Sequence, residues 1–410
     1  MHILVVTHYF WPEDFRINDL VKDWLARGHR VTVLTGTPNY PSGDIFESYR
    51  SQPEKFMNFF GARVIRLPIL PRGKTSARLL GNYLSFIFFA VTLGPLRLRN
   101  VKPDVIFVFE PSPITVGLPA LLLSKLKKCP VVLWVLDLWP ETLTAVGAVK
   151  SGISLRLVGS LVQFIYNGCT VILGQSRKFV PSIRKYCRDD VDVQYFPSWA
   201  EEVLNHGFPE PSTLIPQLAD GFTVMFAGNI GEAQDFSAVL NAAEQLNHDN
   251  SIRWIIVGDG RKANWLKAQL VRRGLQEKVL LLGRHPVEKM PSIYAHADAL
   301  LVSLKRDPVF SLTIPAKVQS YLMAGLPILG MLDGEGREVI QEANAGLTCD
   351  AGDSDGLARA VLSLMAMSPD ERRKLGENAR RYAKREFDRG RLVEKLDNIL
   401  ANAIAECTKK

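Results

Sequence analysis

The most chemically suggestive residue types lie between an apolar strand pattern and a helical one. Residues 311–330 read SLTIPAKVQSYLMAGLPILG, which places Lys317 in the first turn of the predicted helix. The amino end of a helix carries partial positive charge, so a cation there is unfavourable unless an anion binds beside it. Lys317 therefore predicts a site for a phosphate group. The alternative is that its ammonium extends into solvent while the helix only packs.

The start and the buried face of this helix follow from the same stretch. Thr313 is the expected N-cap, because its hydroxyl can accept a backbone N–H, and Pro315 suits the first turn. Val318, Tyr321 and Leu322 recur at helical spacing and predict the stripe that packs against the sheet.

Polar and glycine-rich loops follow other predicted strands of this half of the chain. Ligands of open parallel sheets bind beyond the carboxyl ends of the strands, and glycines let them approach the backbone closely. The sequence GDGRKA has two glycines of the dinucleotide fingerprint but Ala263 in place of the third, so tight turns without a ligand remain an alternative. The candidate ligand-binding residues of these loops are Gly228, Asn229, Gly231, Gly258, Asp259, Gly260, Arg261 and Arg284.

Carboxylates follow an apolar strand pattern in the first half of the chain. The run VVLWVLDLWPETL places Asp137 and Glu141 beyond that strand. A carboxylate there can accept a proton from a substrate hydroxyl or stabilise a developing positive charge. Alternatively, Asp137 caps the next helix and Glu141 is solvated. The same predicted edge carries Trp11, Arg16 and Glu110, and the Trp11 ring either packs or stacks on a sugar.

Apolar runs that alternate with helical patterns surround these residues. Residues 2–7 are continuously apolar, residues 17–25 have apolar side chains at helical spacing, and a strand pattern resumes at 30–35. Further strand patterns occupy 62–68, 104–109, 130–136, 170–176, 222–228, 252–260, 278–283, 299–304 and 327–332. Apolar strands separated by helices indicate an α/β fold with doubly wound parallel sheets, covered on both faces.

The alternation is interrupted once. Residues 196–222 contain four prolines and no clear strand, which is typical of a linker between domains. We therefore expect two Rossmann-like domains, residues 1–200 and 201–389. The charged helical tail at 390–410 is expected to pack back on the first domain.

Composition limits the function classes. A chain of 410 residues exceeds one ordinary core, and a net charge of +8 favours an anionic partner. No nucleic-acid recognition signature accompanies the charge, so nucleic acid is not expected as a partner. The five cysteines include no CxxC pair, which argues against a disulfide framework or a zinc site and favours a reducing compartment. The N-terminus lacks the basic segment of a signal peptide, so we expect a cytoplasmic protein.

One apolar run reaches the length of a membrane span. Residues 79–96 contain no charge, and basic residues flank them: Arg72, Lys74, Arg78, Arg97, Arg99 and Lys102. The run lies between two strands of one predicted sheet, so we interpret it as a crossover helix. Its outer face is either simply exposed or in contact with an anionic membrane surface.

Five motifs in order, HYFWPEDFRINDLVKDWLARGHRVTVLT, DLWPE, FAGNIGEAQ, IIVGDG and TIPAKVQSYLMAGLPIL, span nearly the full chain. With them the chain resembles the retaining family 4 nucleotide-sugar glycosyltransferases of GT-B architecture. Within these it is most similar to the L-fucosamine transferase-like branch of bacterial surface-polysaccharide synthesis.

The resemblance implies two Rossmann-like domains that face each other across a cleft. The second would hold a sugar nucleotide, expected to be a UDP sugar such as that of L-FucNAc. The first would hold a polyprenyl-diphosphate-linked glycan as acceptor. Neither a metal nor a cofactor is expected, and the enzyme would be peripheral on the inner face of the cell membrane.

The resemblance also assigns residues. Gly228–Gly231 would approach the donor, Gly258–Gly260 and Arg284 would lie near the nucleoside, and Asp137 falls near the place of a catalytic histidine. Lys317 and Asp137 are the implied catalytic residues. Further donor-binding residues would be Thr313, Ile314, Pro315, Gln319 and Ser320, and acceptor-binding residues would be Trp11, Arg16, Glu110 and Glu141.

Two departures from the family pattern stand out. A pair of glutamates would be expected at the positions of Leu312 and Ser320, so Gln319 or Ser320 would have to replace the carboxylate that binds ribose. An expected Arg and Lys pair is replaced by Glu232 and Gln234. Stabilisation of the diphosphate would then depend on Lys317, on Arg261 or Arg284, or on helix N-termini. A sugar-nucleotide epimerase and a non-catalytic sugar-nucleotide-binding subunit are the alternatives.

Overall fold

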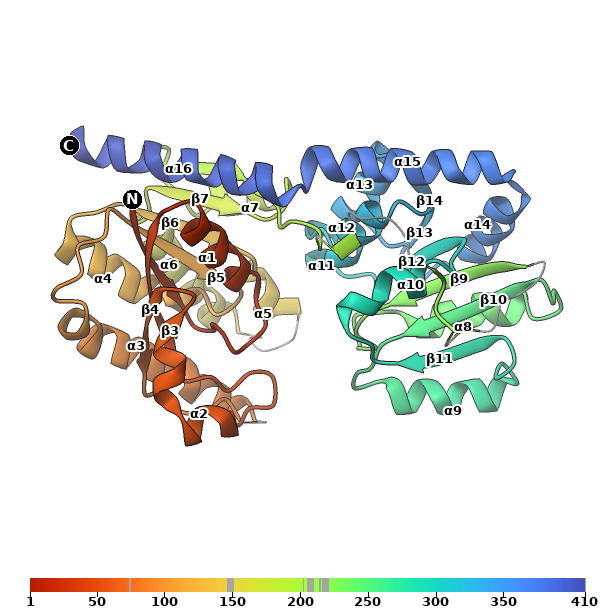
Figure 1. Ribbon diagram of the computed structural model, residues 1–410, viewed down its shortest axis with the longest axis horizontal. Coiled ribbons are helices and arrows are strands. Elements are labelled where there is room, and N and C mark those ends of the chain that lie inside the picture. The colour runs from red at the N-terminus through yellow and green to blue at the C-terminus, as the bar shows by residue number, and fades with distance from the viewer. Residues whose placement is uncertain are drawn as a thin grey trace. The chain divides into compact units, whose positions relative to one another are not determined.

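The computed structural model describes residues 1–73, 75–145, 151–201, 203–204, 210–213, 215 and 221–409. Lys74, residues 146–150, Lys410 and residues 202, 205–209, 214 and 216–220 of the predicted linker lie outside the described residues. The chain divides into two compact units (Figure 1). Unit 1 comprises Met1–Phe196 with Gly390–Lys410, and unit 2 comprises Pro197–Arg389.

Unit 1 is built on an eight-stranded sheet of order β3-β4-β2-β1-β5-β6-β7-β8, parallel except for the β3–β4 pair. The strands are β1 (His2–Thr7), β2 (Arg30–Gly36), β3 (Asn58–Phe59), β4 (Ala62–Leu67), β5 (Val105–Glu110), β6 (Val131–Val135), β7 (Val171–Gly174) and β8 (Asp192–Tyr195). The chain runs outward from β1 through β2 to β4 and then returns to β5 on the other side of β1. The strand order therefore reverses between β1 and β5.

Helices connect these strands. They are α1 (Arg16–Ala26), α2 (Glu47–Ser51), α3 (Ser76–Arg97), α4 (Gly117–Lys127), α5 (Glu141–Ala145), α6 (Gly152–Tyr166) and α7 (Phe179–Arg184), with 3-10 turns at Pro53–Met57 and Ile114–Val116. Right-handed crossovers place α3, α4 and α6 on one face of the sheet, and α4 contacts both α3 and α6.

The C-terminal helix α16 (Arg389–Lys409) belongs with unit 1. Asp397 accepts a hydrogen bond from the indole of Trp24 at 3.0 Å and pairs with Arg27 at 3.3 Å. Trp24 is itself fully buried on the inner face of α1. The tail is thus fixed to the first helix of the chain by an indole and an ion pair.

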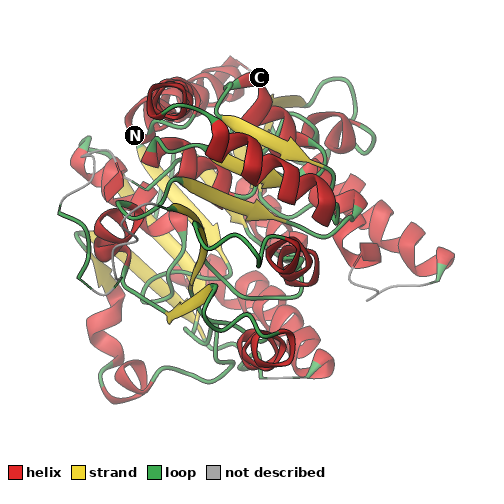
Figure 2. Ribbon diagram, turned by 90° about the vertical axis from the view of Figure 1, so that its right-hand side faces the viewer, coloured by secondary structure: helices red, strands yellow, loops and turns green. Residues whose placement is uncertain are grey.

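Unit 2 contains a six-stranded parallel sheet of order β11-β10-β9-β12-β13-β14. Its strands are β9 (Phe222–Ala227), β10 (Ile252–Val257), β11 (Val279–Gly283), β12 (Ala299–Ser303), β13 (Ile328–Met331) and β14 (Gly346–Cys349). Here the order reverses between β9 and β12. Helices flank the strands (Figure 2). They are α8 (Phe236–Gln245), α9 (Ala263–Arg273), α10 (Met290–Tyr294), α11 (Pro308–Leu312), α12 (Ala316–Ala324), α13 (Glu335–Glu342), α14 (Ser354–Ala366) and α15 (Pro369–Glu386), with a 3-10 turn at Val287–Lys289.

Each apolar run predicted to be a strand is a strand, and the stripe of Val318, Tyr321 and Leu322 is buried. The prediction that Thr313 caps the helix was wrong. The short helix α11 ends just before Thr313, whose hydroxyl donates to the Phe310 carbonyl at 3.0 Å. Helix α12 begins at Ala316, with Pro315 in the N-cap position and no side-chain cap.

Candidate functional site

Lys317 in the first turn of α12 lies at the carboxyl end of β9. A Cβ atom added to Gly228 would lie 2.5 Å from Lys317 Cε and 2.9 Å from Nζ, so only glycine leaves room for this side chain. The Lys317 ammonium also lies 5.0 Å from the ring centroid of Phe226. The side chain therefore lies along the sheet edge beside the strand-order reversal.

Within the described residues, Lys317 has no carboxylate or other hydrogen-bond acceptor as partner. Its pKa falls from 10.5 to about 8 because burial disfavours the charged form. An anion bound beside the ammonium would offset this cost. Lys317 is half-buried, so its environment is compatible with an anion site.

The three loops that follow β9, β10 and β11 hydrogen-bond to one another. Gly228 N–H donates to Val257 at 2.8 Å, Gly258 N–H to Gly283 at 2.7 Å, and Ile230 N–H to Asp259 at 2.8 Å. A Cβ on Gly258 would lie 1.9 Å from the Gly228 carbonyl oxygen. This glycine is therefore required by backbone packing alone, whether or not a ligand binds.

Among the other residues predicted to bind the sugar nucleotide, two contact the glycine loops and two are exposed. The Asn229 amide fills the space between Gly231 and Gly260, where added Cβ atoms would each lie 2.6 Å from it. Asp259 accepts the Gly260 N–H at 2.7 Å. Arg261 and Arg284 are exposed and form no ion pair with any described residue.

Glu232 neutralises neighbouring cations in the loop where the family pattern expects basic residues. Its carboxylate pairs with Lys262 at 2.6 Å and with Lys305 at 3.1 Å. These two lysines are therefore less available to a ligand than Lys317 is.

Gln319 and Ser320 point from α12 towards the segment that opens unit 2. The Gln319 side chain is buried and donates to the Ser198 carbonyl at 2.9 Å. The Ser320 hydroxyl donates to the carboxylate of Glu201 and to the Ala316 carbonyl at 3.0 Å. Sequence reasoning missed Glu201, because it lies in the predicted linker. It nevertheless places a carboxylate against the position where the family pattern expects a glutamate.

Asp137 of unit 1 follows β6 and is partly exposed. Its two carboxylate oxygens accept hydrogen bonds from Thr142 Oγ1 at 2.6 Å and from Trp139 Nε1 at 3.1 Å. These contacts fix the carboxylate at the carboxyl edge of the sheet. Trp139 is buried and serves as a packing and orienting group. Glu141 is half-buried, and burial raises its pKa.

Glu110 at the end of β5 is fully buried, so the expectation that it contacts an acceptor directly does not agree with the structure. Neither of its carboxyl oxygens has a hydrogen-bond partner among the described residues. Burial, followed by the charge of Asp137, raises its pKa well above the ordinary value. Its environment therefore favours the protonated form of the Glu110 carboxyl.

The first loop of unit 1 is organised by packing and by a buried carboxylate. The Trp11 ring lies 4.8 Å from the Phe56 ring and 5.4 Å from the Phe59 ring, which favours its packing role. Arg16 begins α1 and is partly exposed. Glu13 accepts N–H groups from Phe10, Asn39 and Tyr40 at 2.8–3.0 Å, and burial raises its pKa to about 7.

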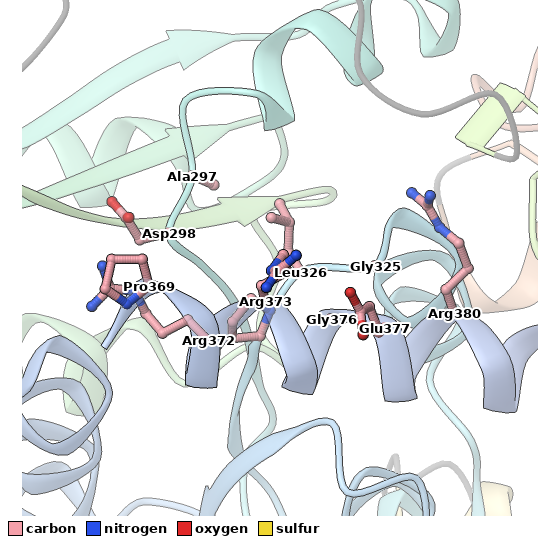
Figure 3. Close-up of a pocket in the computed structure, with 11 residues that line it drawn as sticks. Ala297, Asp298, Gly325, Leu326, Pro369, Arg372, Arg373, Gly376, Glu377 and Arg380 are labelled. Atoms are coloured by element: carbon pink, nitrogen blue, oxygen red, sulfur yellow. The ribbon is translucent and has the colours of Figure 1, made fainter. Parts of the chain in front are cut away.

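A cavity of about 470 Å³ lies at the opposite, amino edge of the sheet in unit 2 (Figure 3). Helix α15 lines it with three arginines, which look suited to an anion. However, Arg380 donates to the Ala324 carbonyl at 2.8 Å and Arg372 to the Met367 carbonyl at 2.8 Å. Arg373 pairs with Asp370 at 2.9 Å. The guanidinium groups thus serve the protein's own helix ends, and we assign no ligand to this cavity.

Comparison with known proteins places these two edges in context. Residues 15–199 match the model described as "Glycosyl transferase 4-like domain", and residues 216–382 match "Glycosyl transferases group 1". The chain belongs to the group 1 glycosyltransferases. The first match falls within unit 1 and a few residues beyond it, and the second within unit 2. The two Rossmann-like sheets are those of the GT-B fold.

Two curated relatives are similar over part of their length. WcaI of Escherichia coli (strain K12), which carries the name of a colanic acid biosynthesis glycosyl transferase, is 26% identical over 317 residues, covering 74% of this chain and 75% of WcaI. The N-acetyl-alpha-D-glucosaminyl L-malate synthase of Bacillus anthracis is 21% identical over 260 residues, covering 61% and 64%.

Solved structures agree in fold over nearly the whole chain. Anabaena Alr3699/HepE in complex with UDP has a TM-score of 0.67 at 15% identity, covering 98% of this chain and 100% of HepE. WaaG, a glycosyltransferase involved in lipopolysaccharide biosynthesis, has a TM-score of 0.65 at 16% identity, covering 98% and 99%.

Proposed function

We propose that this glycosyltransferase moves a sugar from a nucleoside diphosphate, UDP in the first instance, and that Lys317 binds the diphosphate. The supporting observation is the half-buried Lys317 ammonium, which lies against Gly228. Burial lowers the pKa of Lys317 to about 8, and the ammonium has no anionic partner in the described residues. HepE, a neighbour in fold, was solved with UDP.

In the proposed reaction, the bond between the sugar's anomeric carbon and the diphosphate oxygen breaks, and the electron pair stays on the phosphate. Negative charge then grows on the diphosphate, where a fixed cation and backbone N–H groups stabilise the transition state. The oxygen of an acceptor hydroxyl bonds to the anomeric carbon, and its proton passes to the carboxylate of Asp137. Asp137 is the proposed acceptor-side carboxylate, and retention of configuration is proposed from the family resemblance.

The nucleoside is proposed to lie along α12 and the neighbouring glycine loops. Glu201 has a carboxylate beside Ser320, and a carboxylate can accept the two hydroxyl groups of a ribose. Glu201 would then supply from the interdomain segment what the helix itself lacks. Arg284 and Arg261, both exposed beyond the same sheet edge, are further candidates for donor contacts.

We further propose that the acceptor is a polyprenyl-diphosphate-linked glycan of surface-polysaccharide synthesis, and the sugar an N-acetylated deoxyhexosamine such as L-FucNAc. A relative named for colanic acid biosynthesis and a neighbour in fold named for lipopolysaccharide biosynthesis support surface-polysaccharide synthesis. The acceptor and the sugar are proposed from the resemblance of the motifs. An acceptor with a lipid tail requires the enzyme to work at a membrane surface.

The helix layer of unit 1 supports such a location. Helix α3 is long and apolar enough to cross a membrane, yet Phe86 and Ala90 bind it to the domain core. Its other face exposes Leu80, Leu84 and Phe88, each at 56–61%. Membrane contact through this outer face, without a crossing, is therefore the proposed arrangement.

Helix α6 extends the apolar surface. Ile153, Leu157 and Phe164 recur at helical spacing and are all exposed. The sequences of α3, α4 and α6 contain no Asp or Glu, whereas α3 and α6 contain arginine and α4 contains lysine. An apolar surface with only cations is suited to an anionic bilayer.

Nucleotide release tests the reaction. The protein is incubated with a panel of UDP and GDP sugars, with and without a polyprenyl-diphosphate-linked glycan. We expect nucleoside diphosphate release that depends on the acceptor. An epimerase would convert the sugar nucleotide without release, and a binding subunit would do neither; either result would overturn the proposal.

Sedimentation with anionic liposomes at low salt tests the membrane surface. The double variant Phe88→Ser/Leu157→Ser should bind more weakly than the native chain. The matched control Val271→Ser/Leu362→Ser changes exposed apolar residues of unit 2 and should bind as the native chain does. Equal binding by both variants would contradict the assigned surface.

A further inference from the structure

The reversal of strand order in unit 1 also has a cation beside it. Ligands of doubly wound sheets bind beyond the carboxyl ends of the strands at such a reversal. Tyr9 follows β1 and Ser112 follows β5, the two strands on either side of the reversal. The connection from β4 to α3 brings Arg72 to Tyr9, and Tyr83 of α3 lies close to both Ser112 and Tyr9.

Arg72 is held firmly in this position. Its backbone N–H donates to Asn39 Oδ1 at 2.9 Å, and its Nη1 donates to the Tyr9 hydroxyl at 3.2 Å. The guanidinium also lies 5.2 Å from the Tyr40 ring centroid. Asn39 is itself buried and fixed by its contact with the Thr37 carbonyl at 2.7 Å. The guanidinium is thus oriented before any ligand arrives.

Most of the hydrogen-bonding capacity of Arg72 remains unused. A guanidinium has five N–H donors, and only the bond to Tyr9 is made among the described residues. No described carboxylate forms an ion pair with Arg72. A planar fork with free donors matches the oxygens of a phosphate group.

The neighbouring side chains add neutral donors and one acid. Burial raises the pKa of both Tyr9 and Tyr83, so each keeps its hydroxyl proton at neutral pH. Burial lowers the pKa of His8 to about 4, so this ring is neutral and leaves Arg72 as the positive charge of the cluster. Asp137 and Glu13 are the acidic neighbours, and Glu13 is occupied by three backbone N–H groups.

We propose that Arg72, Tyr9 and Tyr83 form a second phosphate site, in unit 1, which binds the diphosphate of the lipid-linked acceptor. The identity of this ligand rests on the proposed function, whereas the site itself rests on the geometry of unit 1. Tyr83 lies on α3, one residue from Leu84 of the exposed apolar face. One helix therefore contacts the phosphate on one side and provides apolar surface for the lipid on another.

Binding of inorganic pyrophosphate tests the site without any need for catalysis. Calorimetry is done in the Lys317→Ala background, so that the site of unit 2 does not contribute. We expect pyrophosphate binding in this variant and at least tenfold weaker binding after Arg72→Gln is added, since charge-assisted hydrogen bonds are lost. No binding in the Lys317→Ala variant, or equal binding after Arg72→Gln, would overturn the proposal.

Acceptor kinetics test the ligand assignment. Arg72→Gln should raise the KM for the polyprenyl-diphosphate acceptor about tenfold or more, with the Kd for UDP unchanged, and Arg72→Lys should restore only part of the loss. The control is Arg63→Gln, an exposed arginine of β4, which should change neither value. Thermal denaturation checks that each variant is folded. A change in the UDP Kd with no change in acceptor KM would overturn the assignment.

Discussion

Replacing Lys317 by methionine is expected to stabilise the free protein while removing most of its activity. The fall of the Lys317 pKa from 10.5 to about 8 means that the folded state holds the charge at a cost. At 1.36 kcal/mol for each tenfold change, this cost is about 3 kcal/mol, an upper value because the side chain keeps some contact with solvent. Methionine keeps the length of the side chain and removes the charge.

The sign of the pH dependence follows from linkage. The folded pKa lies below that of the unfolded chain, so the full cost is present below pH 8 and disappears as the pH rises to about 10.5. Lys317→Met should therefore exceed the native chain in free energy of unfolding at pH 7 and equal it near pH 11. Urea denaturation at the two pH values measures this difference.

Ligand binding provides a second measurement. A diphosphate beside the ammonium should restore its pKa, so UDP binding near pH 9 should take up close to one proton. Calorimetry in two buffers of different ionisation enthalpy measures the uptake. Turnover of Lys317→Met should fall by about 10²- to 10³-fold, as for loss of one preorganised donor to a developing anion. Lys267→Met, an exposed lysine of α9, is the matched control. Lower stability at pH 7, or UDP binding without proton uptake, would refute the reasoning.

Three further changes address neighbouring features. Gly228→Ala should displace the Lys317 side chain and weaken UDP binding at least tenfold, whereas Gly152→Ala, which meets no atom within 4 Å, should leave the UDP Kd unchanged. The free energy of unfolding of the native chain should fall by up to about 3 kcal/mol between pH 4.5 and 7, because the raised pKa of Glu13 makes its ionisation costly in the folded state. In Glu13→Gln the urea midpoint should not show this decrease over the same pH range. Glu201→Gln should weaken the binding of UDP more than that of pyrophosphate, which has no ribose, because the ribose is the proposed partner of Glu201. Paired titrations measure both affinities, and equal weakening would contradict that role.

The sequence was sufficient for the parts of the fold that have a strong local period. Fully apolar strands such as 2–7 and 222–227 were predictable because parallel strands buried on both faces have no polar positions. The start of α12 was misplaced because α11 has only five residues, too few for a helical period, and it ends at the residue before Thr313. Short strands such as β14, with four residues, were missed because they too are short for a recognisable pattern.

Candidate site residues could be proposed from the sequence where a residue directly follows a strand or begins a helix. Lys317 satisfied that condition, since its position in the first turn of a helix indicates a partner of opposite charge. Glu201 and Arg72 did not, because both lie in connections without any periodic pattern. Their neighbours, Ser320 and Tyr9, are set by tertiary contacts between segments distant in sequence.

Both units place a cation beside a reversal of strand order, although the local structures that hold it differ. In unit 2 the cation comes from the first turn of a helix and lies against a glycine, and in unit 1 it comes from an irregular loop and is held by an asparagine and a tyrosine. What they share is the place, beside the strand pair where the order of the sheet reverses. At such a reversal the adjacent crossover helices lie on opposite faces, which leaves the strand ends between them accessible. A cation without an anionic partner at both places fits a reaction in which donor and acceptor each carry a diphosphate.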